Sequence, residues 1–332
     1  MKTIFMSLSS QAVFRNLFFF PGSFFDRSHA FLEQEKDYRL VILVPRRIRE
    51  KYLPIIGDKL HERMLLIPAE IPPKKTMLQQ AFVFLYSYLI YTATTRIMAT
   101  LGTRPDEPPA GGNWYLSPIK IGVARTFGRM QVIKRRIVPF LFMRIFNEHP
   151  FEQFFVQYHP ERVFIPHLYG WFDQLLLEEA KRQGIATIGM PAGWDHFDKY
   201  FLPLRVDKVL APSEQVAKHA VEFQGYEETE IRVVGYPHFD FIVDPRFMLP
   251  RADTIAHLGF PASAKYILYV SGSSYCPDEP DVIETMLKWM DAGKFESDVH
   301  LVIRPYLGGR TKDKAFDEEK FNRFAEHPRV HF

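Results

Sequence analysis

The chain has a single cysteine, Cys276, among its 332 residues. One thiol cannot form an internal disulfide or build a cysteine-rich metal site, so a reducing compartment is expected. The chain also lacks a large net charge, because 42 basic residues and 39 acidic residues leave a net charge of only +3. Nucleic-acid-binding domains are usually more basic, so nucleic acid is not an expected partner.

Long apolar runs are missing as well. The one uncharged stretch of membrane-spanning length, residues 77–95, contains two glutamines, a serine and several threonines. Its large apolar side chains fall at helical spacing, which favours a buried or half-buried helix over a span. The apolar run near the N-terminus is too short for a signal peptide and predicts a first strand. We therefore expect a cytoplasmic protein.

The remaining composition, 47% hydrophobic and 24% charged, is that of a globular protein. Short runs of Val, Ile and Leu alternate with amphipathic helical segments, the clearest of which are residues 172–183, 214–224 and 281–292. The runs are continuous, which is typical of a parallel sheet covered on both faces, and their order predicts doubly wound α/β sheets. The predicted strands are residues 3–8, 40–45, 64–68, 163–166, 186–190, 208–211, 231–235, 266–271 and 299–304.

Three prolines, Pro245, Pro250 and Pro261, separate the seventh strand from a new strand–loop–helix unit. We expect a first domain over residues 1–243, a linker over 244–264 and a second domain over 265–332. Residues 329–332 resemble the start of another strand. The second domain is therefore expected to be incomplete, and the chain a fragment.

Ligands of doubly wound sheets bind beyond the carboxyl ends of the strands, and the polar residues there are the candidate site. Asp195 is a candidate general base with His196 as its neighbouring partner, although a turn cap and a solvated loop residue would have the same sequence. His167 could equally be a hydrogen-bonded packing residue, and the tryptophans could stack on a sugar or close the core. The candidate acceptor-side residues are Ser10, Arg15, His167, Trp171, Trp194 and His238.

The turn Ser271-Gly272-Ser273-Ser274 follows one predicted strand of the second domain, and Arg304 ends another. Small residues before a helix let backbone N–H groups approach an anion, so this turn is a candidate phosphate cradle. A tight turn that needs glycine is the alternative. No metal-ligand spacing is visible in the sequence.

Residues 109–147 hold seven basic residues and no acidic one. With the apolar residues between them they predict a basic, amphipathic surface suited to an anionic membrane or a phosphorylated lipid acceptor. A solvated helical face is the alternative. The basic residues are Lys120, Arg125, Arg129, Lys134, Arg135, Arg136 and Arg144.

Residues 208–240 carry a recognisable passage: VLAPSE before a helix, then Gly225-Tyr226, then IRVVGYPHFD. It resembles the end of the first domain in GT-B-fold enzymes, namely Kdo transferases, CDP-glycerol glycerophosphotransferase-like proteins and the UDP-N-acetylglucosamine 2-epimerase group. Residues 173–189 with Trp194-Asp195 resemble bacterial surface-polysaccharide glycosyltransferases of the same group. The resemblance covers roughly residues 163–304 and is more specific for fold than for substrate.

The resemblance implies two Rossmann-like domains, with the acceptor on the first and a nucleotide-activated donor mostly on the second. The turn Ser271–Ser274 then falls at the donor-phosphate loop. Arg304-Pro305 matches a passage whose following histidine tends to contact the donor, but Tyr306 stands there instead. The fold and the absence of an Asp-x-Asp motif imply no metal and no cofactor.

The expected function is transfer of a sugar or polyol phosphate from a nucleotide donor to a polysaccharide or lipid-linked acceptor of the cell envelope. The basic stretch from Lys120 to Arg144 would hold the protein at the inner face of the plasma membrane. One alternative is a UDP-sugar 2-epimerase of the same fold. Another is a truncated, non-catalytic module that binds an acceptor or partner.

Overall fold

The computed structural model describes most of the chain, and contacts between its residues divide it into two compact units. The first unit ends at Asp244, and the second runs from Pro245 to Phe332. The residues described are 1–10, 13–14, 17, 22–72, 75–100, 114–259, 263–272, 278–306 and 319–332.

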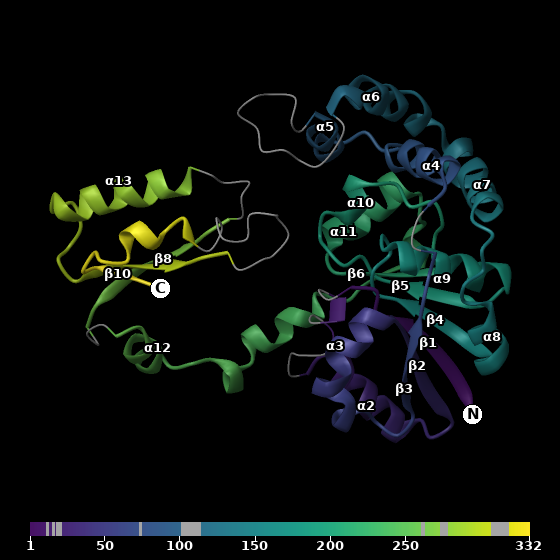
Figure 1. The fold of residues 1–332 in the computed structure, drawn as a ribbon, viewed down its shortest axis with the longest axis horizontal. Helices are drawn as coiled ribbons and strands as arrows, with labels where there is room; N and C mark the ends of the chain where they lie inside the picture. The colour runs from purple at the N-terminus through teal and green to yellow at the C-terminus, as the bar shows by residue number, and fades with distance from the viewer. Residues whose placement is uncertain are drawn as a thin grey trace. The chain divides into compact units, whose positions relative to one another are not determined.

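A parallel sheet of seven strands, in the order β3-β2-β1-β4-β5-β6-β7, forms the centre of the first unit (Figure 1). The order reverses between β1 and β4, so their carboxyl ends form the switch point where ligands bind in open α/β sheets. Each strand matches one of the predicted apolar runs. The strands are β1 (Lys2–Ser7), β2 (Tyr38–Pro45), β3 (Met64–Ala69), β4 (Pro160–Ile165), β5 (Ala186–Gly189), β6 (Lys208–Ala211) and β7 (Ile231–Val233).

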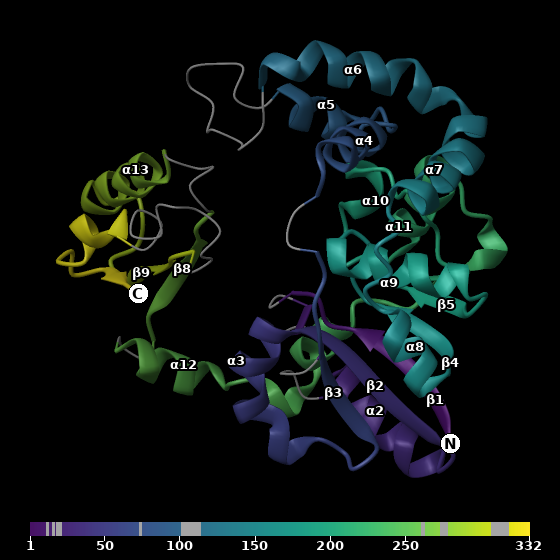
Figure 2. The ribbon, with the colours of Figure 1, turned by 45° about the vertical axis from the view of Figure 1, so that its right-hand side comes forward.

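Helices cover both faces of this sheet, as the continuous apolar strands predict. On one face, α2 (Phe24–Gln34) and α3 (Arg46–Ile56) pack against side chains of β1, β2 and β3. On the other face, α8 (Glu152–Tyr158) and α9 (Trp171–Arg182) close the larger core (Figure 2). Two further helices, α10 (His196–Lys199) and α11 (Glu214–His219), follow β5 and β6.

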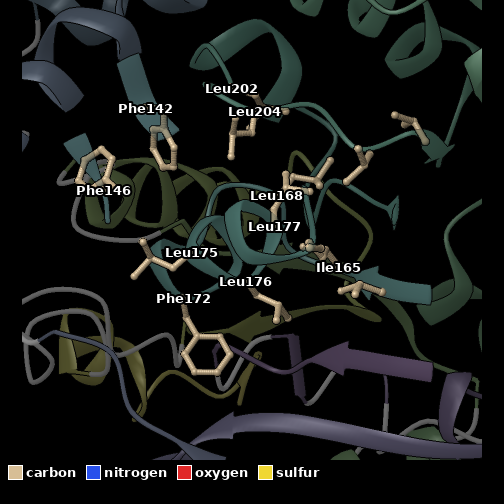
Figure 3. Close-up of a cluster of buried hydrophobic side chains, with 14 of the residues drawn as sticks. Phe142, Phe146, Ile165, Leu168, Phe172, Leu175, Leu176, Leu177, Leu202 and Leu204 are labelled. Carbon is tan, nitrogen blue, oxygen red and sulfur yellow. The ribbon is translucent and has the colours of Figure 1, made fainter. Parts of the chain in front are cut away.

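Helix α9 is buried on all sides. Every residue from Phe172 to Ala180 is buried, and Figure 3 shows its leucines among side chains from neighbouring elements. The bounds lie within one residue of the predicted 172–183, but the polar face expected of an amphipathic helix is not in solvent. Three carboxyl groups, those of Asp173, Glu178 and Glu179, are buried with it. Buried carboxylates need partners, so the surroundings of this helix are a candidate site for chemistry.

A helical layer lies between β3 and β4 in the sequence. Residues 77–95, expected to form one helix, instead form α4 (Met77–Ser87) and the start of α5 (Ala93–Thr100). Helix α4 begins with a capping box, in which the Thr76 side chain accepts from the backbone N–H of Gln79. α6 (Ser117–Arg125) and α7 (Val138–Ile145) complete the layer. Across the described ranges, no helix combines the length and the apolarity that crossing a membrane requires.

The second unit has a parallel sheet of three strands, ordered β10-β9-β8. Ile283, Leu287 and Met290 of α13 pack against Leu301 and Ile303. The strand expected over residues 329–332 is β10, which pairs with β9. The elements are α12 (Arg251–Leu258), β8 (Lys265–Val270), α13 (Glu279–Asp291), β9 (Val299–Arg304) and β10 (Val330–His331).

Candidate active site

A buried carboxyl group lies where the carboxyl ends of β1 and β4 meet. Asp173, in the first turn of α9, is fully buried and accepts a hydrogen bond from the Ser7 hydroxyl at 2.5 Å. Burial raises its pKa to about 7, although hydrogen bonds from Ser7 and Ser9 oppose the rise. Near neutral pH this carboxyl group can therefore exist in either protonation state.

Beside this carboxyl group lies the imidazole of His167, from the loop after β4. Its Nδ1 is 3.6 Å from Asp173 Oδ2 and 3.3 Å from the Ser9 hydroxyl. Burial, together with the nearby His196, lowers the pKa of His167 to about 4, so the ring is neutral at pH 7. A proton on Nδ1, facing Asp173 and Ser9, would leave Nε2 as a proton acceptor.

Gly170 permits the close approach of these groups. A Cβ atom at this position would lie 1.9 Å from Asp173 Oδ2 and 3.0 Å from the Ser9 hydroxyl. Its φ of −64° is open to any residue, so the requirement comes from space and not from backbone conformation. The glycine at the start of α9 is thus part of the site's architecture.

The loop after β5 brings a second histidine to the same place. The rings of His167 and His196 are 5.9 Å apart, and the Tyr169 ring is 5.0 Å from His196. Gln224, which is 1% exposed, fixes this loop by donating to the carbonyls of Phe197 and Tyr200, both at 2.8 Å. The Tyr169 hydroxyl also donates to the Tyr200 carbonyl, at 2.9 Å.

The structure brings Asp195 and His196, the predicted catalytic pair, to the edge that holds His167. The Asp195 carboxylate forms an ion pair with Lys199 at 3.3 Å and keeps a side-chain exposure of 30%. Burial and the Asp195 charge raise the pKa of Tyr236 to about 12, so that hydroxyl stays protonated beside the carboxylate.

The predicted acceptor-side residues do not all converge. Trp171 packs edge-on against Phe146 at 4.7 Å and forms part of the core, whereas Trp194 is 71% exposed. The Ser10 hydroxyl accepts from the backbone N–H of Val13 at 3.2 Å. Arg15 and the side chain of His238 lie outside the described residues.

A cavity of about 210 Å³ lies beside the first turn of α9. The Lys75 ammonium sits 4.1 Å from the centre of the Trp171 ring, and burial lowers its pKa. Gln174 donates to the Leu168 carbonyl at 3.0 Å, but its buried Oε1 has no hydrogen-bond partner among the described residues. The Trp171 ring, the Gln174 Oε1 acceptor and the Lys75 ammonium together suit a ligand that carries hydroxyl groups.

In the second unit, only half of the candidate phosphate cradle is described, because Ser273 and Ser274 lie outside the described residues. The Gly272 backbone N–H donates to the Glu279 carboxylate at 2.7 Å, and Lys320 pairs with that carboxylate at the same distance. The Ser271 hydroxyl accepts from the Tyr306 N–H at 2.8 Å. Arg304 is exposed at the end of β9. This turn therefore binds an anionic group, the chain's own carboxylate.

Sequence reasoning missed Ser7 and Asp173. An aspartate in the first turn of a helix is common because it complements the helix dipole, so Asp173 gave no sign of burial. The one signal in the sequence is Gly170, three residues before Asp173. Because glycine has no side chain, the Asp173 carboxyl group can approach the residues that follow β1.

Comparison with solved structures identifies the class of fold. A putative UDP-N-acetylglucosamine 2-epimerase from Listeria monocytogenes is 12% identical, with a TM-score of 0.50 over 100% of this chain and 68% of that one. A glycosyltransferase from Rickettsia africae is 13% identical, with a TM-score of 0.49 over 99% of this chain and 67% of that one. No protein-family model matches the chain, and neither does any curated protein.

The fold is of the GT-B type, and the architecture expected from the sequence is confirmed. At such low identity the likeness establishes the fold alone.

Proposed function

We propose that the chain transfers a sugar, or a polyol phosphate, from a nucleotide-activated donor to an acceptor hydroxyl of a polysaccharide or lipid-linked glycan. The observation that carries the proposal is the His167 imidazole backed by the buried Asp173 at the switch point of a GT-B sheet. In sugar transfer the acceptor oxygen bonds to the anomeric carbon, the nucleoside diphosphate leaves, and a base takes the hydroxyl proton.

His167 is the proposed proton acceptor, through Nε2. Ser9 and Asp173 are the proposed positioning residues. The Ser9 hydroxyl lies within hydrogen-bonding distance of Nδ1, at 3.3 Å, and Asp173 Oδ2 faces the same nitrogen at 3.6 Å, beyond a hydrogen bond. Asp195 and His196, at the same edge, are proposed to orient the acceptor hydroxyl. The cavity beside Trp171 and Gln174 is the proposed place for the acceptor sugar. Ser271, Gly272 and Arg304 remain the proposed donor-phosphate residues, with Glu279 displaced by the incoming anion.

His167→Asn is expected to lower the transfer rate by about 100-fold or more, because a general base contributes 10²–10⁴ to the rate. The measurement is release of nucleoside diphosphate from UDP- and CDP-activated donors in the presence of a glycan acceptor. Asp195→Asn, on the same edge, is expected to change KM more than kcat. A large loss of kcat in Asp195→Asn with an active His167→Asn would move the base to Asp195.

An epimerase of the same fold is the second candidate, favoured by the likeness to the Listeria protein and by two imidazoles 5.9 Å apart that can move protons. Interconversion of UDP-N-acetylglucosamine without any acceptor, followed by NMR, would establish it in place of transfer. Absence of UDP and CDP binding would leave a non-catalytic module.

We also propose that α6, α7 and the segment between them contact an anionic membrane. Five of the seven basic residues are exposed, among exposed apolar side chains such as Phe127, Val132 and Phe140. The other two, Lys120 and Lys134, are buried near aromatic rings, so the predicted surface is smaller than the sequence indicated. The exposed basic residues are Arg125, Arg129, Arg135, Arg136 and Arg144.

Arg129→Glu with Arg136→Glu is expected to weaken binding to phosphatidylglycerol vesicles by roughly 30-fold or more, at about 1 kcal/mol per basic residue at an anionic surface. Co-sedimentation measures it, with phosphatidylcholine vesicles as the uncharged comparison. Arg47→Glu with Lys59→Glu makes the same charge change at exposed positions elsewhere and should bind like wild type. Equal loss in both double variants would show only a net-charge effect.

A further inference from the structure

A second group of buried carboxylates lies further along α9, away from the proposed active site. Glu178 and Glu179 follow Asp173 by five and six residues, which is about 8–9 Å along a helix axis at 1.5 Å per residue. Their side chains are 1% and 0% exposed. His149, from the segment before α8, faces both of them.

The distances in this cluster are too long for hydrogen bonds and suitable for a shared ion. His149 Nδ1 is 3.5 Å from Glu178 Oε2 and 3.6 Å from Glu179 Oε2, and one potential ligand atom from each residue lies within 4.8 Å of the others. Two ligands at about 2.1 Å from a tetrahedral ion are themselves about 3.4 Å apart. An N–H···O hydrogen bond would be about 2.9 Å.

The polar atoms that face the cluster have no hydrogen-bond partner within the part of the chain that the structure describes. Both oxygens of Glu178, Oε2 of Glu179 and Nδ1 of His149 are buried without one. By contrast, the outer oxygen of Glu179 is satisfied, because Arg182 donates to Oε1 at 2.6 Å. An unsatisfied buried carboxylate costs several kcal/mol, so a whole set of them needs a missing partner.

Charge indicates what that partner is. Glu178, Glu179 and Glu152 supply three negative charges, and Arg182, which pairs with both Glu179 and Glu152, supplies one positive charge. A proton on His149 would still leave an excess of negative charge.

We propose that His149, Glu178 and Glu179 bind a divalent transition-metal ion, Zn²⁺ in the first instance. One imidazole nitrogen and two carboxylate oxygens are ligands that zinc accepts, and water would complete four-coordination from the side where His149 is 27% exposed. Such an ion ties the segment before α8 to α9. No metal is expected from the sequence, because these ligands come from two distant segments without a recognisable spacing.

The test is zinc binding by the whole chain after treatment with a chelator, followed by calorimetric titration and by metal analysis. Wild type is expected to take up one zinc ion and to show a raised melting temperature. His149→Asn is expected to weaken binding by roughly 100-fold, since even indirect partners of a metal matter 10–100-fold. Asparagine tolerates the left-handed φ of 45° at this position.

The matched control is His159→Asn. His159 also has a φ of 45° but is exposed and outside the cluster, so this variant should bind zinc like wild type. Glu178→Gln removes one ligand charge while keeping shape, and it is expected to fold without zinc and to show no zinc-dependent rise in melting temperature. Failure of wild type to bind more zinc than Glu178→Gln, or equal losses in the two histidine variants, would overturn the proposal.

Discussion

Gly170→Ala is expected to destabilise the first unit by about 2–4 kcal/mol and to abolish the proposed activity. The new Cβ would sit 1.9 Å from Asp173 Oδ2, so the buried carboxyl group must move and its hydrogen bond from Ser7 must lengthen or break. Overpacking costs about 1–3 kcal/mol and an unsatisfied buried polar group about as much. Chemical denaturation followed by circular dichroism measures the change.

Gly122→Ala is the control for this substitution. Gly122 lies within α6, and a Cβ there would meet no atom within 4 Å. Alanine at this position should stabilise the protein by up to about 1 kcal/mol, because glycine is a poor residue for a helix interior. Equal stability of Gly170→Ala and wild type would show that the carboxyl group moves without cost and that the site is not tightly packed.

The strands could be predicted from the sequence because their physical signal is local. Continuous apolar runs such as those of β2 and β9 are needed wherever both faces of a sheet are covered, and turn residues bound them. The bounds of α9 were predicted to within one residue for a similar reason. Gly184, with a φ of 68°, ends the segment in a conformation that glycine adopts easily.

The surroundings of polar side chains could not be predicted, because these depend on segments distant in sequence. Asp173 is buried by Ser7, 166 residues earlier in the chain, and Glu178 faces His149 from another segment. The sequence pattern predicts Lys120 and Lys134 on a basic surface, yet both are buried, Lys120 beside the ring of Tyr88, just after α4, and Lys134 beside the ring of Phe201, after α10. Charge in a sequence indicates exposure only when no such partner exists.

These examples also explain why only part of the candidate site could be predicted from the sequence. Asp195 and His196 lie in and just after the loop that follows β5, so the rule that ligands bind at the carboxyl ends of strands indicates them. The residue that supports His167 lies inside a helix, where no rule about loops would find it. We expect the buried carboxyl group there to lower the stability of the fold, as is common at functional sites.

Substitution of Asp173 would measure that loss of stability directly. Asp173→Asn is expected to be more stable than wild type by about 1–2 kcal/mol at pH 8, although asparagine preserves the shape of the side chain. The folded-state pKa of Asp173 is raised from 3.8 to about 7, so in this window the native protein holds a proton that the unfolded chain releases. The contribution of this group to stability therefore falls as the pH rises from about 4 to 7.

The difference in free energy of unfolding between Asp173→Asn and wild type should accordingly grow between pH 4 and 7 and stay constant above pH 7. The transfer rate of Asp173→Asn should be lower by about 100-fold, because an amide N–H facing His167 Nδ1 would favour the tautomer that carries its proton on Nε2. Asp207→Asn is expected to change stability in the opposite direction. Burial raises the pKa of Asp207, but the ion pair with Lys181 and the hydrogen bonds from Thr187 lower it overall. Asp207→Asn should therefore be less stable than wild type above pH 4. If Asp173→Asn were also less stable than wild type there, Asp173 would be stabilising in its ionised form.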